Sequence, residues 1–234
     1  TVSDLPRLGA EEEFHVVDLE SRRSAPEVEA LLDGLDGPEF APELQRSLVE
    51  TNTPVCDTLD DLHSHLRRLR GTLESVAAPL GLGVVAAGTV PLVDDSAISA
   101  GARYERMHHE YQLLVGEQHI CGAQVHVDVP DRDVAVQVVR RVAPYLPILL
   151  AVSASSPYWQ GRDSGYASFR SMVWSRWPTA GPPAHVETAA EYDELVAQLI
   201  ASGTISDPGM VYFDIRPSAH LPTVELRVCD ACPE

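Results

Sequence analysis

The distribution of apolar and polar residues along the chain predicts six strands. Alternating apolar positions, or short apolar runs bounded by turn residues, are typical of strands. The last two expected strands follow each other directly through Pro217 and Pro222, which predicts an antiparallel hairpin. The expected strands lie near residues 8–17, 44–53, 82–89, 119–129, 209–216 and 222–229.

Helical spacing fills most of the segments between these strands. Residues 58–78 carry leucines three and four positions apart behind Asp57 and Thr58, which is a typical helix start. Residues 188–202 begin with a capping box and end at Gly203. Further helices are expected after Pro26 and over residues 102–117 and 131–143.

This order of elements predicts an α+β domain. Strands and helices do not alternate regularly enough for a doubly wound parallel sheet, so we expect a mainly antiparallel sheet. Helices should cover one face and leave the other open for a site. Residues 153–183 lack periodicity but are rich in aromatic residues, which favours an ordered, functional loop. No linker or internal repeat is visible, so residues 1–234 are expected to form one domain.

The first expected strand carries two acidic side chains on one face. Glu11 and Glu13 project together because successive side chains of a strand alternate between faces. Acidic residues are depleted in strands, and neighbouring like charges repel each other. A pair of carboxylates suits Mg²⁺ or Mn²⁺, although a solvated edge strand explains a glutamate run alone equally well.

Two later strands carry polar residues in the same manner. Glu50 lies within an apolar strand pattern, and Glu43 precedes it. They can contribute to a metal site only if they face the same side of the sheet as Glu11 and Glu13. Further on, Gln124, His126 and Asp128 alternate with valines and should share a face. A lone histidine in a strand is more often structural, but this polar row makes a metal site about equally plausible.

The expected hairpin carries mixed charges. Tyr212, Asp214 and Arg216 should share one face, as should Glu225 and Arg227. One interpretation is a row of cross-strand ion pairs, which contribute little stability each. The other adds a further acid for a metal and arginines for phosphate. Spacing alone slightly favours the ion pairs.

Composition excludes several functions. A formal charge of −18 argues against nucleic acid or an anionic membrane as a partner. All 17 basic residues are arginine, which excludes a lysine Schiff base and a Walker A loop. The apolar run at 142–154 is interrupted by Pro144 and Pro147 and is expected to be too short to cross a bilayer. The four cysteines are interpreted as reduced thiols, and a cytoplasmic location is expected.

Eight short segments, in order across nearly the whole chain, resemble the carboxylate–amine ligases of the glutamate–cysteine ligase type 2 family. Each segment alone is a weak signal, but the ordered set is specific. The segments are Gly9-Ala-Glu-Glu-Glu13, Glu43-Leu with Val49-Glu-Thr-Asn-Thr53, Arg103-Tyr104, Gln124-Val-His-Val127, Ser156-Pro-Tyr-Trp-Gln-Gly161, Gly165-Tyr-Ala-Ser-Phe-Arg170, Asp214-Ile-Arg-Pro-Ser218 and Thr223-Val-Glu-Leu-Arg-Val-Cys-Asp230.

The resemblance implies a fold and a reaction. The fold would be glutamine-synthetase-like, with a curved, mainly antiparallel sheet of about six strands that binds ATP and Mg²⁺ or Mn²⁺ on its concave face. ATP would phosphorylate a carboxylate, the γ-carboxylate of glutamate in the family's named activity. An amine, typically that of cysteine, would then displace phosphate from the acyl phosphate to form an amide. Amino acids would be the substrates, and the family leaves room for a homo-oligomer.

The resemblance also assigns roles to residues. Arg227 would meet the transferring phosphoryl group, Arg103 the nucleotide and Arg170 the amino-acid carboxylate. The full set implied is Glu11, Glu13, Glu43, Glu50, His126 and Glu225 for metals, Arg227 and Glu50 for catalysis, Arg103, Arg216 and Arg227 for ATP, and Arg170, Gln124 and Tyr104 for the substrate.

Three departures from the family pattern leave alternatives open. The family's Gly-Thr-His-Pro is Gly88-Thr-Val-Pro91 here, and Gln124 replaces a histidine. Either change could alter the number of metals or the nucleotide contacts. The chain also ends just after the last matching strand, so we expect it to lack the family's C-terminal helical region. A non-catalytic ATP- and metal-binding homologue and a divalent-metal hydrolase are the alternatives.

Overall fold

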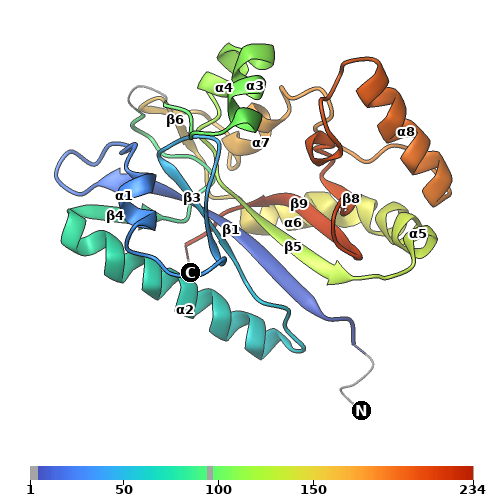
Figure 1. Ribbon diagram of the computed structural model, residues 1–234, viewed down its shortest axis with the longest axis horizontal. Helices are drawn as coiled ribbons and strands as arrows, with labels where there is room; N and C mark the ends of the chain where they lie inside the picture. The colour runs from blue at the N-terminus through green and yellow to red at the C-terminus, as the bar shows by residue number, and fades with distance from the viewer. Residues whose placement is uncertain (1–4, 94–96, 234) are drawn as a thin grey trace.

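An antiparallel sheet of seven strands forms the centre of the computed structural model, which describes residues 5–93 and 97–233 (Figure 1). The strand order is β2-β3-β1-β5-β9-β8, and β4 pairs with the far half of β1. A separate two-stranded hairpin consists of β6 (Tyr158–Trp159) and β7 (Arg162–Asp163). The strands of the main sheet are β1 (Leu8–Asp18), β2 (Phe40–Pro42), β3 (Leu48–Asn52), β4 (Leu82–Val85), β5 (Gly122–Asp128), β8 (Ile215–Pro217) and β9 (Thr223–Asp230).

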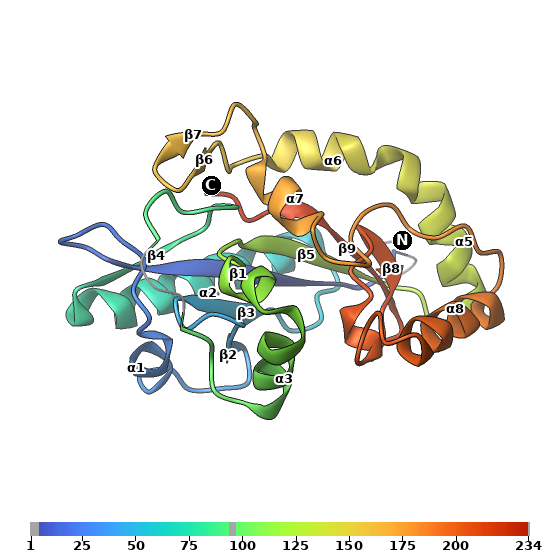
Figure 2. The same ribbon diagram turned by 90° about the horizontal axis from the view of Figure 1, so that it is seen from above.

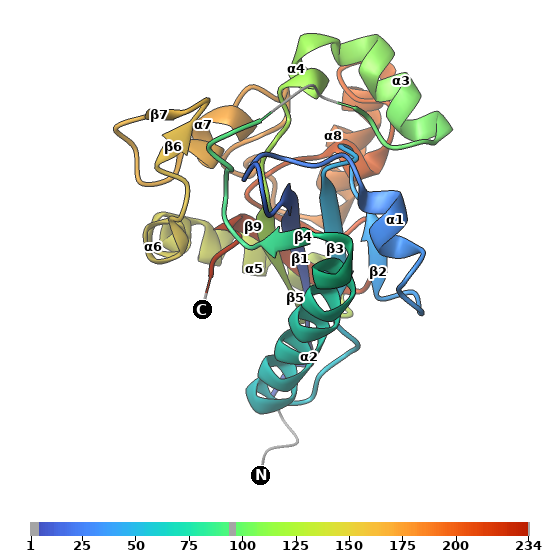
Figure 3. The same cartoon turned by 90° about the vertical axis from the view of Figure 1, so that its left-hand side faces the viewer.

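Helices cover one face of this sheet and border the other. Figure 2 shows α6 on one side of the sheet and α3 on the other, and Figure 3 shows α2 opposite α3 and α4. The α-helices are α1 (Val28–Leu32), α2 (Leu59–Ala77), α3 (Ala102–Tyr111), α4 (Leu113–Gly116), α5 (Arg132–Val142), α6 (Leu146–Ser153), α7 (Phe169–Trp174) and α8 (Ala189–Ala201). Short 3₁₀ turns span Ala78–Leu80, Ala143–Tyr145 and Pro208–Met210. The predicted α+β class is confirmed.

The core lies on the face of the sheet that is opposite the acidic side chains. Phe14 and Val16 of β1 are buried there with Leu73 of α2. At the other end, Leu146 of α6 packs in a second cluster with Ile215 of β8. Each such side chain contributes about 1.5–3 kcal/mol when it leaves water. Burial of alternate residues therefore fixes which face of β1 carries Glu11 and Glu13.

Two predicted strands are shorter than the pattern suggested. The strand expected at 44–53 covers only β3, because buried Gln45 turns away and donates its side-chain amide to the Val115 carbonyl at 2.6 Å. The strand expected at 209–216 covers only β8. There the Arg216 guanidinium binds the carbonyls of Gly209 at 2.9 Å and Val211 at 2.6 Å, which holds that backbone out of the sheet.

The apolar run at 142–154, which was predicted to be too short to cross a bilayer, is part of a longer helical stretch. Helices α5 and α6 join through a 3₁₀ turn into one stretch, Arg132–Ser153, which is long and apolar enough by length and composition alone. Pro144 and Pro147 do not break it because each stands in the first turn of a new segment, where no backbone N–H is needed. In this fold the stretch packs against β8 and β9.

Candidate active site

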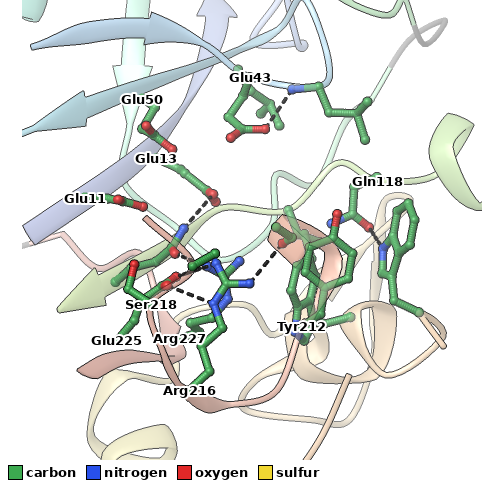
Figure 4. A pocket seen from close by; sticks show the side chains of 18 of the residues that line it. Glu11, Glu13, Glu43, Glu50, Gln118, Tyr212, Arg216, Ser218, Glu225 and Arg227 are labelled. Carbon is green, nitrogen blue, oxygen red and sulfur yellow. Dashed lines mark hydrogen bonds and ion pairs between the residues drawn. The ribbon is translucent and has the colours of Figure 1, made fainter. Parts of the chain in front are cut away.

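A cavity of about 340 Å³ occupies the open face of the sheet. Strands β1, β3, β5 and β9 form its floor, where Figure 4 shows Glu11, Glu13 and Glu50 above Glu225 and Arg227. Residues of α3 and α7 form its walls. All twelve residues that the sequence proposed for the site line this one cavity. The structure thus brings together side chains that lie far apart in the sequence, the first at Glu11 and the last at Arg227.

Three carboxylates form the first cluster, which consists of Glu13, Glu43 and Glu50. Their oxygens lie within 4.8 Å of one another. The cluster forms because Glu13 of β1 and Glu50 of β3 are directly paired across the two strands, while Glu43 follows the end of β2. A backbone N–H of Gly122 donates to Glu13 at 2.5 Å, and the Asn52 side chain donates to Glu50 at 2.8 Å.

The first cluster shows the electrostatic cost of holding these acids together. Burial, and then the charge of Glu43, raise the pKa of Glu13 to about 7. Burial and the charges of Glu43, Glu11 and Glu13 raise the pKa of Glu50 well above its usual range. The three carboxylates repel one another when they are ionised, and a bound cation would reduce this repulsion.

The second cluster consists of Glu11, His126 and Glu225, whose ligand atoms also lie within 4.8 Å of one another. The His126 Nε2 atom lies 3.1 Å from a Glu11 oxygen, and its Nδ1 atom lies 2.9 Å from the Thr223 hydroxyl. A second partner of this kind fixes the orientation of a ligating imidazole. The register places His126 of β5 beside Glu225 of β9.

Two buried arginines adjoin the second cluster. Arg216 donates to Glu225 through Nε at 2.8 Å and Nη2 at 3.2 Å, and Arg227 donates to both Glu225 and Gln124. Burial alone would raise the pKa of Glu225, but Arg227 and Arg216 lower it to about 2. Glu225 therefore stays ionised, and the predicted cross-strand ion pair exists inside the cavity.

Arg227 contacts the second cluster directly, through Glu225, and the first cluster through Gln124. Its guanidinium lies 5.7 Å from the ring centre of Trp174 and 5.9 Å from that of Tyr212, so two aromatic faces hold its plane. Gln124 accepts from Arg227 and its amide lies 3.5 Å from Glu13. Gln124 thus links the arginine to the first cluster.

Arg103 and Tyr104 border the cavity from α3. Arg103 is about half exposed and lies 3.5 Å from Asp207. The Tyr104 hydroxyl donates to the Pro42 carbonyl at 3.2 Å, and burial raises the pKa of this tyrosine. Both side chains are therefore positioned at a wall of the cavity that helix α3 provides.

Arg170 is buried at the base of the cavity. It donates to the carbonyls of Val228 at 3.4 Å and Arg227 at 3.3 Å, while its Nε has no hydrogen-bond partner among the residues described. Asp230 lies 3.8 Å from it. The same Asp230 accepts from the hydroxyls of Ser156 at 2.6 Å and Ser168 at 2.9 Å. The serine-rich segment expected to be irregular is ordered by this buried carboxylate.

Sequence reasoning missed the aromatic wall. Trp174 and Trp177 line the cavity beside Tyr212, with ring centres 4.7 Å and 5.3 Å from that tyrosine. The only signal was the aromatic content of residues 153–183. Asp214, expected beside Tyr212 and Arg216, does not line the cavity, because residues 211–214 lie outside a strand and alternation fails there. Asp128 lies instead near the sheet's end, paired with Arg7.

The donor set fits hard divalent cations. Both clusters offer carboxylate oxygens, with one imidazole, and Mg²⁺ and Mn²⁺ prefer such ligands. The convergence of three carboxylates is the observation that supports this fit, and burial together with the charge of Glu43 raises the pKa values of Glu13 and Glu50 within it. Arginines beside such acids suit a substrate that carries phosphate or carboxylate groups.

An antiparallel sheet with helices on one face and a cavity on the other defines a domain of the α+β class. The chain belongs to glutamate–cysteine ligase family 2 (GCS2), whose family model matches residues 7–234. It is 60% identical over 229 residues to a Frankia casuarinae protein provisionally named glutamate–cysteine ligase 2-2. That alignment covers 97% of this chain and 27% of the relative, so the chain spans about a quarter of that protein's length.

Two solved structures share the fold. A bifunctional glutathione synthetase from Pasteurella multocida superposes with a TM-score of 0.76 at 15% identity, over 97% of this chain and 34% of that protein. A glutamate–cysteine ligase from Francisella tularensis, solved in complex with AMP, gives a TM-score of 0.68 at 13% identity, over 97% and 61% of the two chains. At these identities the likeness establishes the fold.

Proposed function

We propose that this domain is the catalytic part of an ATP- and Mg²⁺-dependent carboxylate–amine ligase. The observation that carries the proposal is the placement of two oxygen-donor clusters and Arg227 in one cavity. Membership of the family and the fold of its neighbours support it. Glutamate and cysteine are the first substrates to test, with glutamate reacting through its γ-carboxylate.

The reaction needs two bond exchanges. A carboxylate oxygen would bond to the γ-phosphorus of ATP while the bond from that phosphorus to the ADP oxygen breaks. The amine nitrogen would then bond to the acyl carbon, inorganic phosphate would leave, and the amine proton would pass to solvent. Neither exchange requires covalent chemistry by the protein, so positioning and electrostatics supply the catalysis.

Acidic and basic residues of the cavity would have different roles in this reaction. Glu13, Glu43 and Glu50 would hold one divalent cation, and Glu11, His126 and Glu225 a second. Such cations, when bound, offset the charge of the phosphates. Arg227 would bind the moving phosphoryl group, because its plane is already fixed by Glu225, Gln124 and two rings.

The remaining arginines of the cavity would bind the substrates. Arg170 keeps an unpaired Nε at the base of the cavity, and Arg103 is accessible at its wall. Tyr104 lies next to Arg103, and Gln124 reaches the first cluster. We assign Arg170 to the carboxylate of the amino acid and Arg103 to the nucleotide.

Phosphate release with a panel of amino acids tests the proposal. The protein, ATP and Mg²⁺ should release phosphate only when a carboxylate substrate and an amine are both present. Release without any amine would indicate a hydrolase. Nucleotide binding that raises the melting temperature, without release for any pair, would indicate a non-catalytic homologue. Either result contradicts the ligase proposal.

A further inference from the structure

Asp230, the last residue of β9, is a buried carboxylate that does not line the cavity. Its side chain is 0% exposed. One carboxylate oxygen accepts from the Ser168 hydroxyl at 2.9 Å. The other accepts from the Ser156 hydroxyl at 2.6 Å and from the Ser155 backbone N–H at 3.0 Å. A carboxylate is tolerated in such a place because these donors replace water.

Both serine hydroxyls also hold the start of α7. The Ser156 oxygen accepts from the Arg170 backbone N–H at 3.1 Å. The Ser168 oxygen accepts from the Ser171 backbone N–H at 3.2 Å, as an N-cap does. A hydroxyl has one proton to donate and lone pairs with which to accept. Because Asp230 accepts both protons, the serine oxygens remain directed at the first turn of α7.

Helix α7 in turn supplies part of the cavity wall. It lies beside β9 (Figure 2) and carries Arg170 and Trp174, both of which line the cavity. The Arg170 guanidinium lies 5.8 Å from the ring centre of Trp174, and the Arg227 guanidinium lies 5.7 Å from the same ring centre. The position of α7 therefore determines where Arg170 stands in the cavity.

Two glycines show how closely this region is packed. A Cβ at Gly88 would lie 2.6 Å from the Asp230 carboxyl group. A Cβ at Gly122 would lie 2.4 Å from the Arg170 guanidinium. Both distances are shorter than a Cβ contact allows, so these glycines leave room for the carboxylate and the guanidinium where they stand.

We propose that Asp230 is a positioning residue that fixes the start of α7 through Ser156 and Ser168, and so places Arg170 for the carboxylate of the amino acid. The inference rests on the proposed function, which assigns that role to Arg170. Asp230 itself would not touch the substrate. Its oxygen lies 3.8 Å from the Arg170 Nη1 atom, which is too long for a hydrogen bond, so the two serines are the hydrogen-bonded connection.

Phosphate-release kinetics of Asp230→Asn test the inference, with the amino-acid pair that gives turnover in the wild type. An amide has one acceptor oxygen where a carboxylate has two, so one serine loses its acceptor. The KM for the carboxylate substrate should rise about tenfold, because a displaced guanidinium binds a carboxylate poorly. A loss of folded protein alone would lower kcat and leave KM unchanged.

The KM for ATP with Mg²⁺ provides the internal comparison. No residue of either acidic cluster is hydrogen-bonded to Asp230 within the part of the chain that the structure describes. This KM should therefore change by less than about twofold in Asp230→Asn.

Further variants test the route through the serines. Ser168→Ala keeps the carboxylate and removes one connection, so it should raise the KM for the carboxylate substrate about threefold. The double variant Asp230→Asn/Ser168→Ala should lose less than the product of the two single effects, because both act on one path. Ser175→Ala, whose exposed hydroxyl donates to the Met172 carbonyl at 2.8 Å, is the matched control and should change neither KM. Melting temperatures identify variants that do not fold, and Ser168→Ala carries the test if Asp230→Asn is among them.

Three results would overturn the inference. The first is an equal rise in the KM values for both substrates, which would indicate general damage to the cavity. The second is an unchanged KM for the carboxylate substrate in Asp230→Asn or, where that variant does not fold, in Ser168→Ala. The third is single effects that multiply in the double variant. A wild type that releases no phosphate with any amino-acid pair contradicts the proposed function, and the inference fails with it. An active wild type therefore separates the two failures.

Discussion

At the scale of single residues, the defining feature is a group of acids that destabilise one another. Glu13 and Glu50 face each other across two strands with Glu43 beside them, and burial, followed by the charge of Glu43, raises the pKa of both. Folding alone does not favour such an arrangement. A site that holds a cation explains why the repulsion is tolerated.

Metal binding should therefore depend on pH near neutrality. Because the pKa of Glu13 is raised to about 7, its carboxyl is largely protonated at pH 6 and a cation must displace that proton. We expect Mn²⁺ affinity to rise several-fold between pH 6 and pH 8, with proton release visible by calorimetry in buffers of different ionisation enthalpy. The variant Glu13→Gln should flatten this dependence. Affinity that falls as the pH rises would contradict the assignment.

Glu50→Gln should separate binding from stability. Removing the charge relieves repulsion from Glu43, Glu11 and Glu13, so the melting temperature without metal should stay the same or rise by about a few degrees. Mn²⁺ affinity should fall by about tenfold or more. Glu74→Gln, at an exposed position of α2, is the matched control and should change neither. Unchanged metal binding in Glu50→Gln would place Glu50 outside the site.

Most residues of the site could be predicted because they lie on strands. Alternation of faces placed Glu11 with Glu13 and Gln124 with His126, and these pairs line the cavity. Residues off the strands could not be placed in this way. Trp174 comes from a short helix whose position depends on Asp230. The placement predicted for Asp214 was wrong because its segment lies outside the sheet.

At the scale of elements, a buried ion pair joins helix α2 to the sheet. Arg70 of α2 donates to Glu12 of β1 at 2.9 Å and to the Cys232 carbonyl at 2.8 Å. Glu12 is 5% exposed. The alternation that directs Glu11 and Glu13 into the cavity directs Glu12 toward the opposite face, where it needs this partner.

Arg70→Leu should therefore destabilise the fold by about 3–5 kcal/mol, because it leaves a buried carboxylate without its main partner. Urea unfolding measures this loss. The double variant Glu12→Leu/Arg70→Leu should recover much of it, since no buried charge remains. Arg67→Leu, exposed on the same helix, should cost less than about 0.5 kcal/mol. Equal costs for the two single arginine variants would contradict the role of the pair.

Elements whose ends are set by neighbouring residues were predicted correctly. Elements whose ends are set by side-chain contacts elsewhere in the fold were not. Thr58 accepts from the Asp61 N–H and begins α2 where the capping pattern indicated. The start of β8 depends instead on Arg216 binding carbonyls of its own loop, which no local pattern reveals. Pro147 was predicted to interrupt the apolar run, although it lies in the first turn of α6 within a continuous helical stretch.

At the scale of the whole molecule, charge decides how an anionic nucleotide could bind. The formal net charge is −18, and acids line much of the cavity floor. A nucleotide without cations would meet this repulsion, whereas a nucleotide with two divalent ions would be drawn to the clusters. The fold class and family followed from the sequence, but the substrates depend on cavity walls that no strand pattern defines.

The most direct test is a crystal structure of the protein grown with AMP-PNP and Mn²⁺, with anomalous scattering used to locate the metal. We expect one Mn²⁺ peak bounded by Glu13, Glu43 and Glu50 and another bounded by Glu11, His126 and Glu225, with phosphate oxygens between them and Arg227. Manganese at neither cluster, or a nucleotide bound away from the open face of the sheet, would contradict the proposed site.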